Sequence, residues 1–117
     1  MKVKNLLVGS LIIFSVIGAT TSAWAEDVRM FARHEVADYA AWRNVYNNLA
    51  PTQKKMGIYS KAVYQSSDNP NEVTVIHDFH SMEEAKAFAA SPELKSAMEK
   101  AGVKGAPQIW FTTLAVK

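Results

Sequence analysis

Two kinds of hydrophobic spacing follow one another along the chain, and their order most restricts how it can fold. Alternating apolar and polar residues, typical of half-buried strands, occupy residues 28–36, 58–66, 72–80 and 107–116. Apolar residues three or four positions apart, typical of amphipathic helices, occupy residues 39–56 and 82–101. The order strand, helix, strand, strand, helix, strand predicts one α+β domain over residues 26–117, with a ferredoxin-like βαββαβ fold.

Local signals divide these elements further. Pro51 lies inside the first helical stretch and predicts a kink or a break after Ala50. Residues 67–71, SDNPN, form a turn cluster, so the second and third strands make a hairpin. Ser81 and Glu84 form the Ser-x-x-Glu capping box of the second helix. Ser91, followed by proline, restarts that helix, so we expect it in two pieces.

A compact arrangement of these elements is a four-stranded antiparallel sheet of order 4-1-3-2 with both helices on one face. The other face then carries apolar residues such as Phe31, Ile76 and Trp110. A bare apolar patch of this kind is unusual on a monomer, and two sheets packed face to face remove it. We therefore expect a two-fold homodimer.

The first 25 residues have the pattern of a secretory signal peptide. Two lysines precede an apolar run at residues 6–19, and Ala23 and Ala25 supply the small residues of a cleavage site. A membrane anchor is the alternative, but a span needs about 20 apolar residues and this run is shorter. We expect cleavage after Ala25 and a periplasmic or secreted mature protein that has no membrane segment.

The mature part of the chain has a balanced charge. Without Lys2 and Lys4 it contains 11 basic and 11 acidic residues, so it has no excess positive charge for a nucleic-acid backbone. The chain has no cysteine and therefore no disulfide. A domain of 92 residues without disulfides has a small core, which is a second reason to expect a homodimer.

Three segments of the chain form a family pattern. They are DYAAWRNVY at residues 38–46, DNPNEVTVIHDFHSMEEAKAFAASPELKSAMEKAGV at residues 68–103, and PQIWF at residues 107–111. These segments resemble the dimeric α/β-barrel superfamily, and in particular its antibiotic biosynthesis monooxygenase-like (ABM) branch. The resemblance implies a pocket between the sheet and the helices of each subunit.

The resemblance also implies an activity, namely cofactor-independent oxygenation or cyclisation of a small aromatic or polyketide-like molecule. The alternative is a non-catalytic protein of the same fold that binds a small ligand or serves in a stress response. The candidate ligand-binding residues, which are aromatic or apolar, are Trp42, Tyr46, Phe79, Phe88 and Met98. Haem-degrading members use a tryptophan and, ten positions later, a histidine where this chain has Phe88 and Met98. We therefore expect no haem and no other cofactor.

The stretch VTVIHDFHS at residues 73–81 holds two of the three histidines. Side chains alternate between the two faces of a strand, so His77 and His80 point apart and cannot chelate one metal ion. The third histidine, His34, is 43 residues upstream of His77. We therefore expect no metal site, and we interpret His80 as a polar residue beside the Ser81 cap.

Asp78 lies on the face of the third strand that is opposite to His77. This is the face that we expect to meet the second subunit. Arg29 and Arg33 have the matching alternation in the first strand. We expect Asp78 to pair with one of these arginines across the dimer interface.

His34 and His77 are the candidate catalytic residues. Both share a face with apolar neighbours in their strands, so both are expected under the helices, near Trp42 and Tyr46. They could be core histidines, each bonded to a backbone carbonyl or a hydroxyl. They could instead line a pocket and accept a proton, because a histidine titrates near neutral pH. The residues alone leave both interpretations open.

Overall fold

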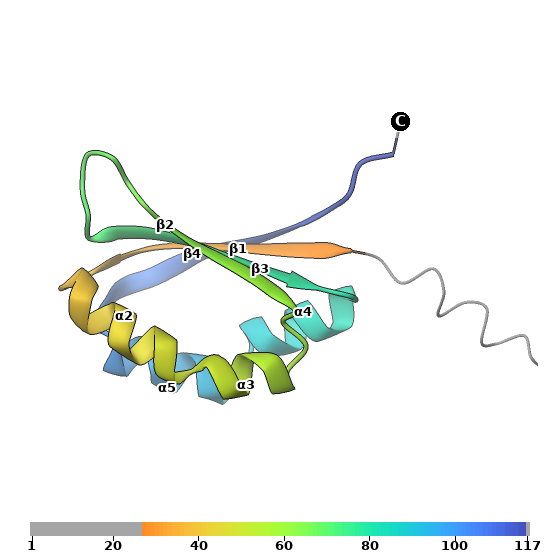
Figure 1. Cartoon of the computed structure of the whole chain (residues 1–117), viewed down its shortest axis with the longest axis horizontal. Helices are drawn as coiled ribbons and strands as arrows, with labels where there is room; N and C mark the ends of the chain where they lie inside the picture. The colour runs from red at the N-terminus through yellow and green to blue at the C-terminus, as the bar shows by residue number, and fades with distance from the viewer. Residues whose placement is uncertain (1–26, 117) are drawn as a thin grey trace, which may run out of the picture.

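The computed structural model describes residues 27–116, so the expected signal peptide lies outside the described residues. The elements follow the predicted order, with each helix in two pieces (Figure 1). They are β1 (Val28–Val36), α2 (Tyr39–Asn48), α3 (Ala50–Lys55), β2 (Ser60–Gln65), β3 (Glu72–Phe79), α4 (Met82–Ala89), α5 (Pro92–Lys100) and β4 (Val103–Thr113).

The four strands form one antiparallel sheet of order β2-β3-β1-β4, which is the predicted order 4-1-3-2 counted from the opposite edge. Figure 1 shows all four helices beneath one face of this sheet. The predicted ferredoxin-like fold is therefore confirmed. Strand β1 also has the predicted bounds, and its burial alternates residue by residue along its length.

Helices α2, α4 and α5 begin at side-chain caps, whereas α3 has none. Asp38 accepts a hydrogen bond from the backbone N–H of Ala41 at 2.9 Å, and Ser81 accepts one from Glu84 at 3.1 Å. The first helical stretch breaks at Leu49, between α2 and α3, because Pro51 in the first turn of α3 cannot donate a backbone hydrogen bond. The caps and the proline thus fix where the helices begin and break along the chain.

Strand β4 begins at Val103, four residues before the start that the sequence pattern indicates at Pro107. Its pairing with β1 shifts between Arg33, opposite Gln108, and Glu35, opposite Lys104. The β4 residues between these two pairs include Gly105 with a φ of +68°, a value that glycine adopts without strain. This bulge lies opposite His34 and leaves that residue without a partner position in β4.

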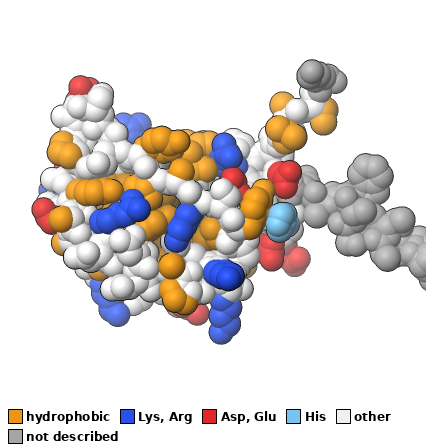
Figure 2. Space-filling view, viewed as in Figure 1, with side chains coloured by type: hydrophobic (Ala, Val, Ile, Leu, Met, Phe, Trp, Pro, Cys, Tyr) orange, Lys and Arg blue, Asp and Glu red, His pale blue; other side chains and the backbone are white. Residues whose placement is uncertain are grey.

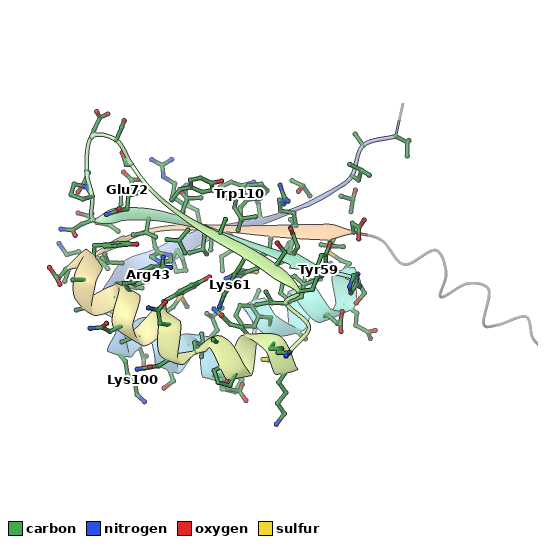
Figure 3. The ribbon with its side chains drawn as sticks, in the orientation of Figure 1. Arg43, Tyr59, Lys61, Glu72, Lys100 and Trp110 are labelled. Carbon is green, nitrogen blue, oxygen red and sulfur yellow. The ribbon has the colours of Figure 1, made fainter. Side chains whose placement is uncertain are left out.

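The face of the sheet away from the helices carries an aromatic pair. The rings of Phe31 and Trp110 stack with centroids 5.1 Å apart and planes 2° apart. Trp110 remains 43% exposed and Tyr64 remains 59% exposed. Figure 3 shows Trp110 on this side of the sheet. The apolar face expected from the sequence is therefore present.

Asp78 forms its ion pair within the chain rather than with a second subunit. Arg29 Nε and Nη2 donate to the two carboxylate oxygens of Asp78 at 2.8 and 3.0 Å. The two residues are paired directly opposite one another in β1 and β3. The expectation of a pair across a dimer interface is corrected, because the strand register already places an arginine beside this carboxylate.

Candidate functional site

His77 and His34 both lie on the helix-facing side of the sheet, but at different positions along it. His77 pairs with Met30 of β1, whereas His34 of β1 pairs with Val73 of β3. Four residues of β1 therefore separate the two levels, a distance of about 13 Å along the strand. The two histidines therefore approach the helix layer from different levels of the sheet.

A cavity of about 40 Å³ lies between these histidines and the helices. Small side chains leave this space open, because Ala32 of β1 lies between the two histidine levels and Ala97 of α5 faces it from the helix layer. The surface area that lines the cavity is almost entirely apolar. The lining residues of the sheet and α2 that matter below are His34, Trp42, Tyr46 and His77, joined by Gln53 of α3 and Met98 of α5.

His77 is enclosed by aromatic side chains and is 2% exposed. Its Nε2 atom lies 2.8 Å from the hydroxyl of Tyr46, while its Nδ1 atom has no partner among the described residues. Phe88 meets the imidazole ring edge-on at 5.5 Å. Burial is the main cause that lowers the pKa of His77 to about 4, and the charge of Lys61 adds to it. The imidazole is therefore neutral near pH 7.

The Tyr46 hydroxyl keeps its proton over the same pH range. Burial raises the pKa of Tyr46 to about 12, although the Gln53 amide and the Arg43 guanidinium act in the opposite direction. Arg43 and Lys61 lie 5.7 and 5.4 Å from the centre of the Tyr46 ring. Figure 2 shows Lys and Arg side chains lying over an apolar area where the sheet meets the helices. A neutral phenol and a neutral imidazole thus share one hydrogen bond beside two cations.

Gln53 brings an amide to the wall of the cavity. The residue is 2% exposed, and its Oε1 atom accepts a hydrogen bond from Lys61 Nζ at 2.7 Å. Its Nε2 atom has no partner among the described residues. Figure 3 shows Lys61 directed from β2 toward the helix layer. The amide nitrogen is therefore a buried donor beside the Tyr46 hydroxyl.

His34 has a different environment. The residue is 8% exposed, its ring lies 5.7 Å from that of Trp42, and neither ring nitrogen has a partner within residues 27–116. Burial lowers the pKa of His34. Of the two interpretations that the sequence left open, bonding to a hydroxyl holds for His77, whereas His34 has no such bond.

Five of the seven predicted site residues line the cavity, and two do not. His34, Trp42, Tyr46, His77 and Met98 contact the space. The other two, Phe79 and Phe88, are 0% exposed in the closed core, with ring centroids 5.9 Å apart. Phe79 and Phe88 do not line the cavity because they pack against each other on the α4 side of His77.

Sequence reasoning missed Gln53 and Lys61 as members of the site. A signal for Gln53 was present, since it is the polar residue on an otherwise apolar helix stripe that includes Tyr46 and Met56. No local pattern identifies Lys61, because its role depends on β2 lying beside α3. Within residues 27–116, His, Cys, Asp and Glu side chains form no group of three that could hold a metal ion.

No family model and no curated protein sequence matches the chain. Solved structures do match its fold. A protein from Bordetella bronchiseptica assigned to the antibiotic biosynthesis monooxygenases has a TM-score of 0.68 at 14% identity, covering 78% of this chain and 99% of that one. SnoaB, a cofactor-independent oxygenase from Streptomyces nogalater, has a TM-score of 0.65 at 15% identity, covering 80% and 97%.

A third match is a protein from Caulobacter crescentus with the same assignment, with a TM-score of 0.64 at 20% identity, covering 79% of this chain and 92% of that one. These likenesses confirm the fold that the sequence resemblance implied. They do not fix an activity, because one fold supports many functions. The argument for function therefore rests on the cavity and the residues around it.

Proposed function

We propose that this chain is a cofactor-independent monooxygenase or cyclase that acts on a small phenolic or enolic molecule in the cavity between sheet and helices. The observation on which the proposal rests is the neutral, buried imidazole of His77 at the wall of an apolar cavity, hydrogen-bonded to Tyr46 at 2.8 Å. The fold shared with SnoaB is consistent with this chemistry.

His77 is the proposed general base. Its Nδ1 atom is free to take a proton in the tautomer in which Nε2–H donates to the Tyr46 oxygen. The low pKa of His77 reflects the burial of a single positive charge. Proton transfer from a substrate creates an anion beside the imidazolium, and this pairing offsets part of the burial penalty. The base is thus effective toward an acid bound in the cavity and weak toward water.

Deprotonation makes the substrate electron-rich enough to react with molecular oxygen. For a CH₂ group that becomes a carbonyl, one oxygen atom enters the product and the other leaves as water with the two hydrogens. The apolar lining favours this reaction, because little water is present to compete for the anion. Without an oxygen step, the same anion can attack a carbonyl within the molecule, which is cyclisation.

The cavity must enlarge to admit a ring. Its volume of about 40 Å³ holds little more than a few water-sized groups, whereas an engineered cavity that binds benzene measures about 150 Å³. Helix α5 is the element best able to move, because every one of its residues is at least partly exposed. An outer groove between α2 and α5 shares Val45, Leu49 and Ala97 with the cavity and supplies an entry route.

The same proposal includes a homodimer that is exported. The exposed Trp110 and Tyr64 on the helix-free face favour packing against a second copy. The pattern of residues 1–25 favours export to the periplasm or the medium.

A binding protein is the second candidate function, and the small cavity volume favours it, since a cavity that stays closed performs no chemistry. The experiment that separates the two compares the mature protein with its His77→Gln variant against a panel of anthrones and hydroquinones under air. Oxygen uptake and product formation are measured together with chemical unfolding. We expect turnover that falls about 10²–10⁴-fold in a folded His77→Gln variant. Ligand binding without turnover by the wild-type protein would favour the binding protein.

A further inference from the structure

Gln53 is an unusual residue for the position that it occupies. It lies in α3 on the helix stripe that packs on the sheet, and only 2% of it is exposed. A buried amide is normally hydrogen-bonded at both ends, because water cannot replace the missing partners. The free Nε2 atom of Gln53 is therefore a feature that calls for a ligand.

Lys61 determines which end of the Gln53 amide faces the cavity. An ammonium group can only donate, so the atom 2.7 Å from Lys61 Nζ must be the oxygen of the amide. This contact removes the ambiguity between the oxygen and nitrogen of a glutamine side chain. The amide nitrogen is then the end of the side chain that is turned away from Lys61, and Gln53 is one of the residues that line the cavity.

Three polar groups lie close together behind the apolar lining of the cavity. The Tyr46 hydroxyl is bonded to His77, and the nearby Gln53 amide favours the ionised form of the same hydroxyl. The imidazole Nδ1 of His77 and the amide Nε2 of Gln53 are both without partners among the described residues. In the tautomer whose Nε2–H donates to Tyr46, a ligand that satisfies both atoms presents an oxygen acceptor close to an acidic hydrogen.

We propose that the cavity binds neutral ketones and related carbonyl compounds, with the Gln53 amide N–H donating to the carbonyl oxygen and Lys61 acting as the positioning residue for that amide. The inference rests on the proposed function, since it assigns the substrate class of the same cavity. The reacting hydrogen is the one on the atom next to the carbonyl carbon, facing His77.

The geometry assigns a role to Gln53 during proton transfer. The C–H bond next to the carbonyl breaks, the proton moves to His77 Nδ1, and the electron pair spreads onto the carbonyl oxygen. The Gln53 N–H then donates to an oxygen that carries more negative charge, so its hydrogen bond strengthens in the transition state. The Lys61 ammonium draws electron density from the Gln53 oxygen and makes the N–H a better donor.

A matched pair of probes tests this assignment. Acetophenone and α-methylstyrene have nearly the same shape, and they differ in that the first has a carbonyl oxygen where the second has a CH₂ group. Each is titrated into ¹⁵N-labelled mature protein, and dissociation constants are obtained from chemical-shift changes. In the wild-type protein we expect acetophenone to bind about 3–10-fold tighter and to shift the side-chain amide signals of Gln53.

Gln53→Glu removes the donor, keeps the shape of the side chain and keeps a contact for Lys61. Gln53→Met removes the donor without adding charge, and it replaces Gln53→Glu in the experiment if that variant does not fold. We expect both to abolish the preference for acetophenone while α-methylstyrene still binds. Lys61→Met should reduce the preference and Lys61→Arg should restore it, whereas Lys55→Met removes an exposed charge on the same helix as Gln53 and should leave it unchanged.

The outcomes separate this inference from the proposed function. A preference that persists in both Gln53 variants would overturn the role of the amide. Equal binding of the two probes to wild-type protein would overturn the ketone assignment and leave the cavity as a ligand site. If neither probe bound to wild-type protein, the ligand cavity itself and the inference built on it would both be overturned.

Discussion

The Tyr46 hydroxyl and the His77 Nε2 atom lie 2.8 Å apart and are buried, although the two residues come from different layers of the fold and are 31 positions apart in the chain. The bond joins α2 to β3 at the wall of the cavity. It is therefore both a structural link and the proposed means of orienting the base.

Replacement of Tyr46 by phenylalanine should destabilise the domain. The Tyr46→Phe variant keeps the ring but leaves His77 Nε2 buried without its partner, which costs about 1–3 kcal/mol. Urea unfolding of mature protein at pH 7 measures this loss. Tyr59→Phe is the matched control, because Tyr59 is 49% exposed and its hydroxyl bond to Asp27 lies at the surface, so the same change there should have little effect. Equal losses in the two variants would contradict the assigned bond.

Stability should decrease in mild acid because of His77. The pKa of His77 is about 4 in the folded protein, compared with an ordinary value of 6.5 in the unfolded chain. The unfolded chain therefore binds the proton first as the pH falls. The contribution is fully present above pH 6.5 and is lost between pH 6.5 and 4, by about 3 kcal/mol in total. His34, with its lowered pKa, adds to the same trend.

Unfolding free energies measured in urea at intervals from pH 7.5 to 4 test this dependence. We expect a shallower slope in His77→Gln than in the wild-type protein, because the variant lacks the group that titrates. Parallel slopes for the two proteins would show that His77 has the same pKa in the folded and unfolded states.

Removal of the Trp42 side chain should be strongly destabilising. Trp42 is 3% exposed and its ring stacks on Tyr46 at 4.8 Å and on Tyr39 at 5.7 Å. Trp42→Ala should cost about 3–5 kcal/mol, since a large cavity replaces the indole. Chemical denaturation of the mature protein gives this value, and a loss near zero is incompatible with Trp42 as the anchor of α2.

The mature protein should be a dimer in solution through its helix-free sheet face. Light scattering at micromolar concentration is expected to report two subunits. Trp110→Glu places a charge on this face beside Phe31 and should shift the protein to a monomer. Lys55→Glu, an exposed change in the helix layer, is the control and should remain dimeric. A wild-type monomer would require another explanation for the exposed aromatic residues.

Export should leave an N-terminus at Glu26. Mass spectrometry of protein recovered from the periplasm or medium of an expressing bacterium measures it. Ala25→Leu, which removes the small residue before the cleavage site, should leave the first 25 residues attached. Recovery of wild-type chain that still begins at Met1 would indicate a membrane anchor.

The sequence by itself determined the elements and their faces. Alternation in residues 28–36 and 72–80 placed His34 and His77 on the helix side of the sheet, because side-chain direction in a strand follows from the backbone alone. The Ser81 cap and the break at Pro51 were equally local, since each depends on backbone hydrogen bonds within a few residues.

The tertiary structure alone decided which of these side chains meet. Strand register set His34 and His77 four residues apart, and the bulge at Gly105 lies before residue 107, where the sequence pattern indicates the start of the last strand. The contact of Lys61 with Gln53 arises because β2 passes beside α3. The spacing of apolar residues in the sequence predicts the face on which each side chain lies. Contacts between elements depend on strand register and packing, which are set only when the whole chain folds.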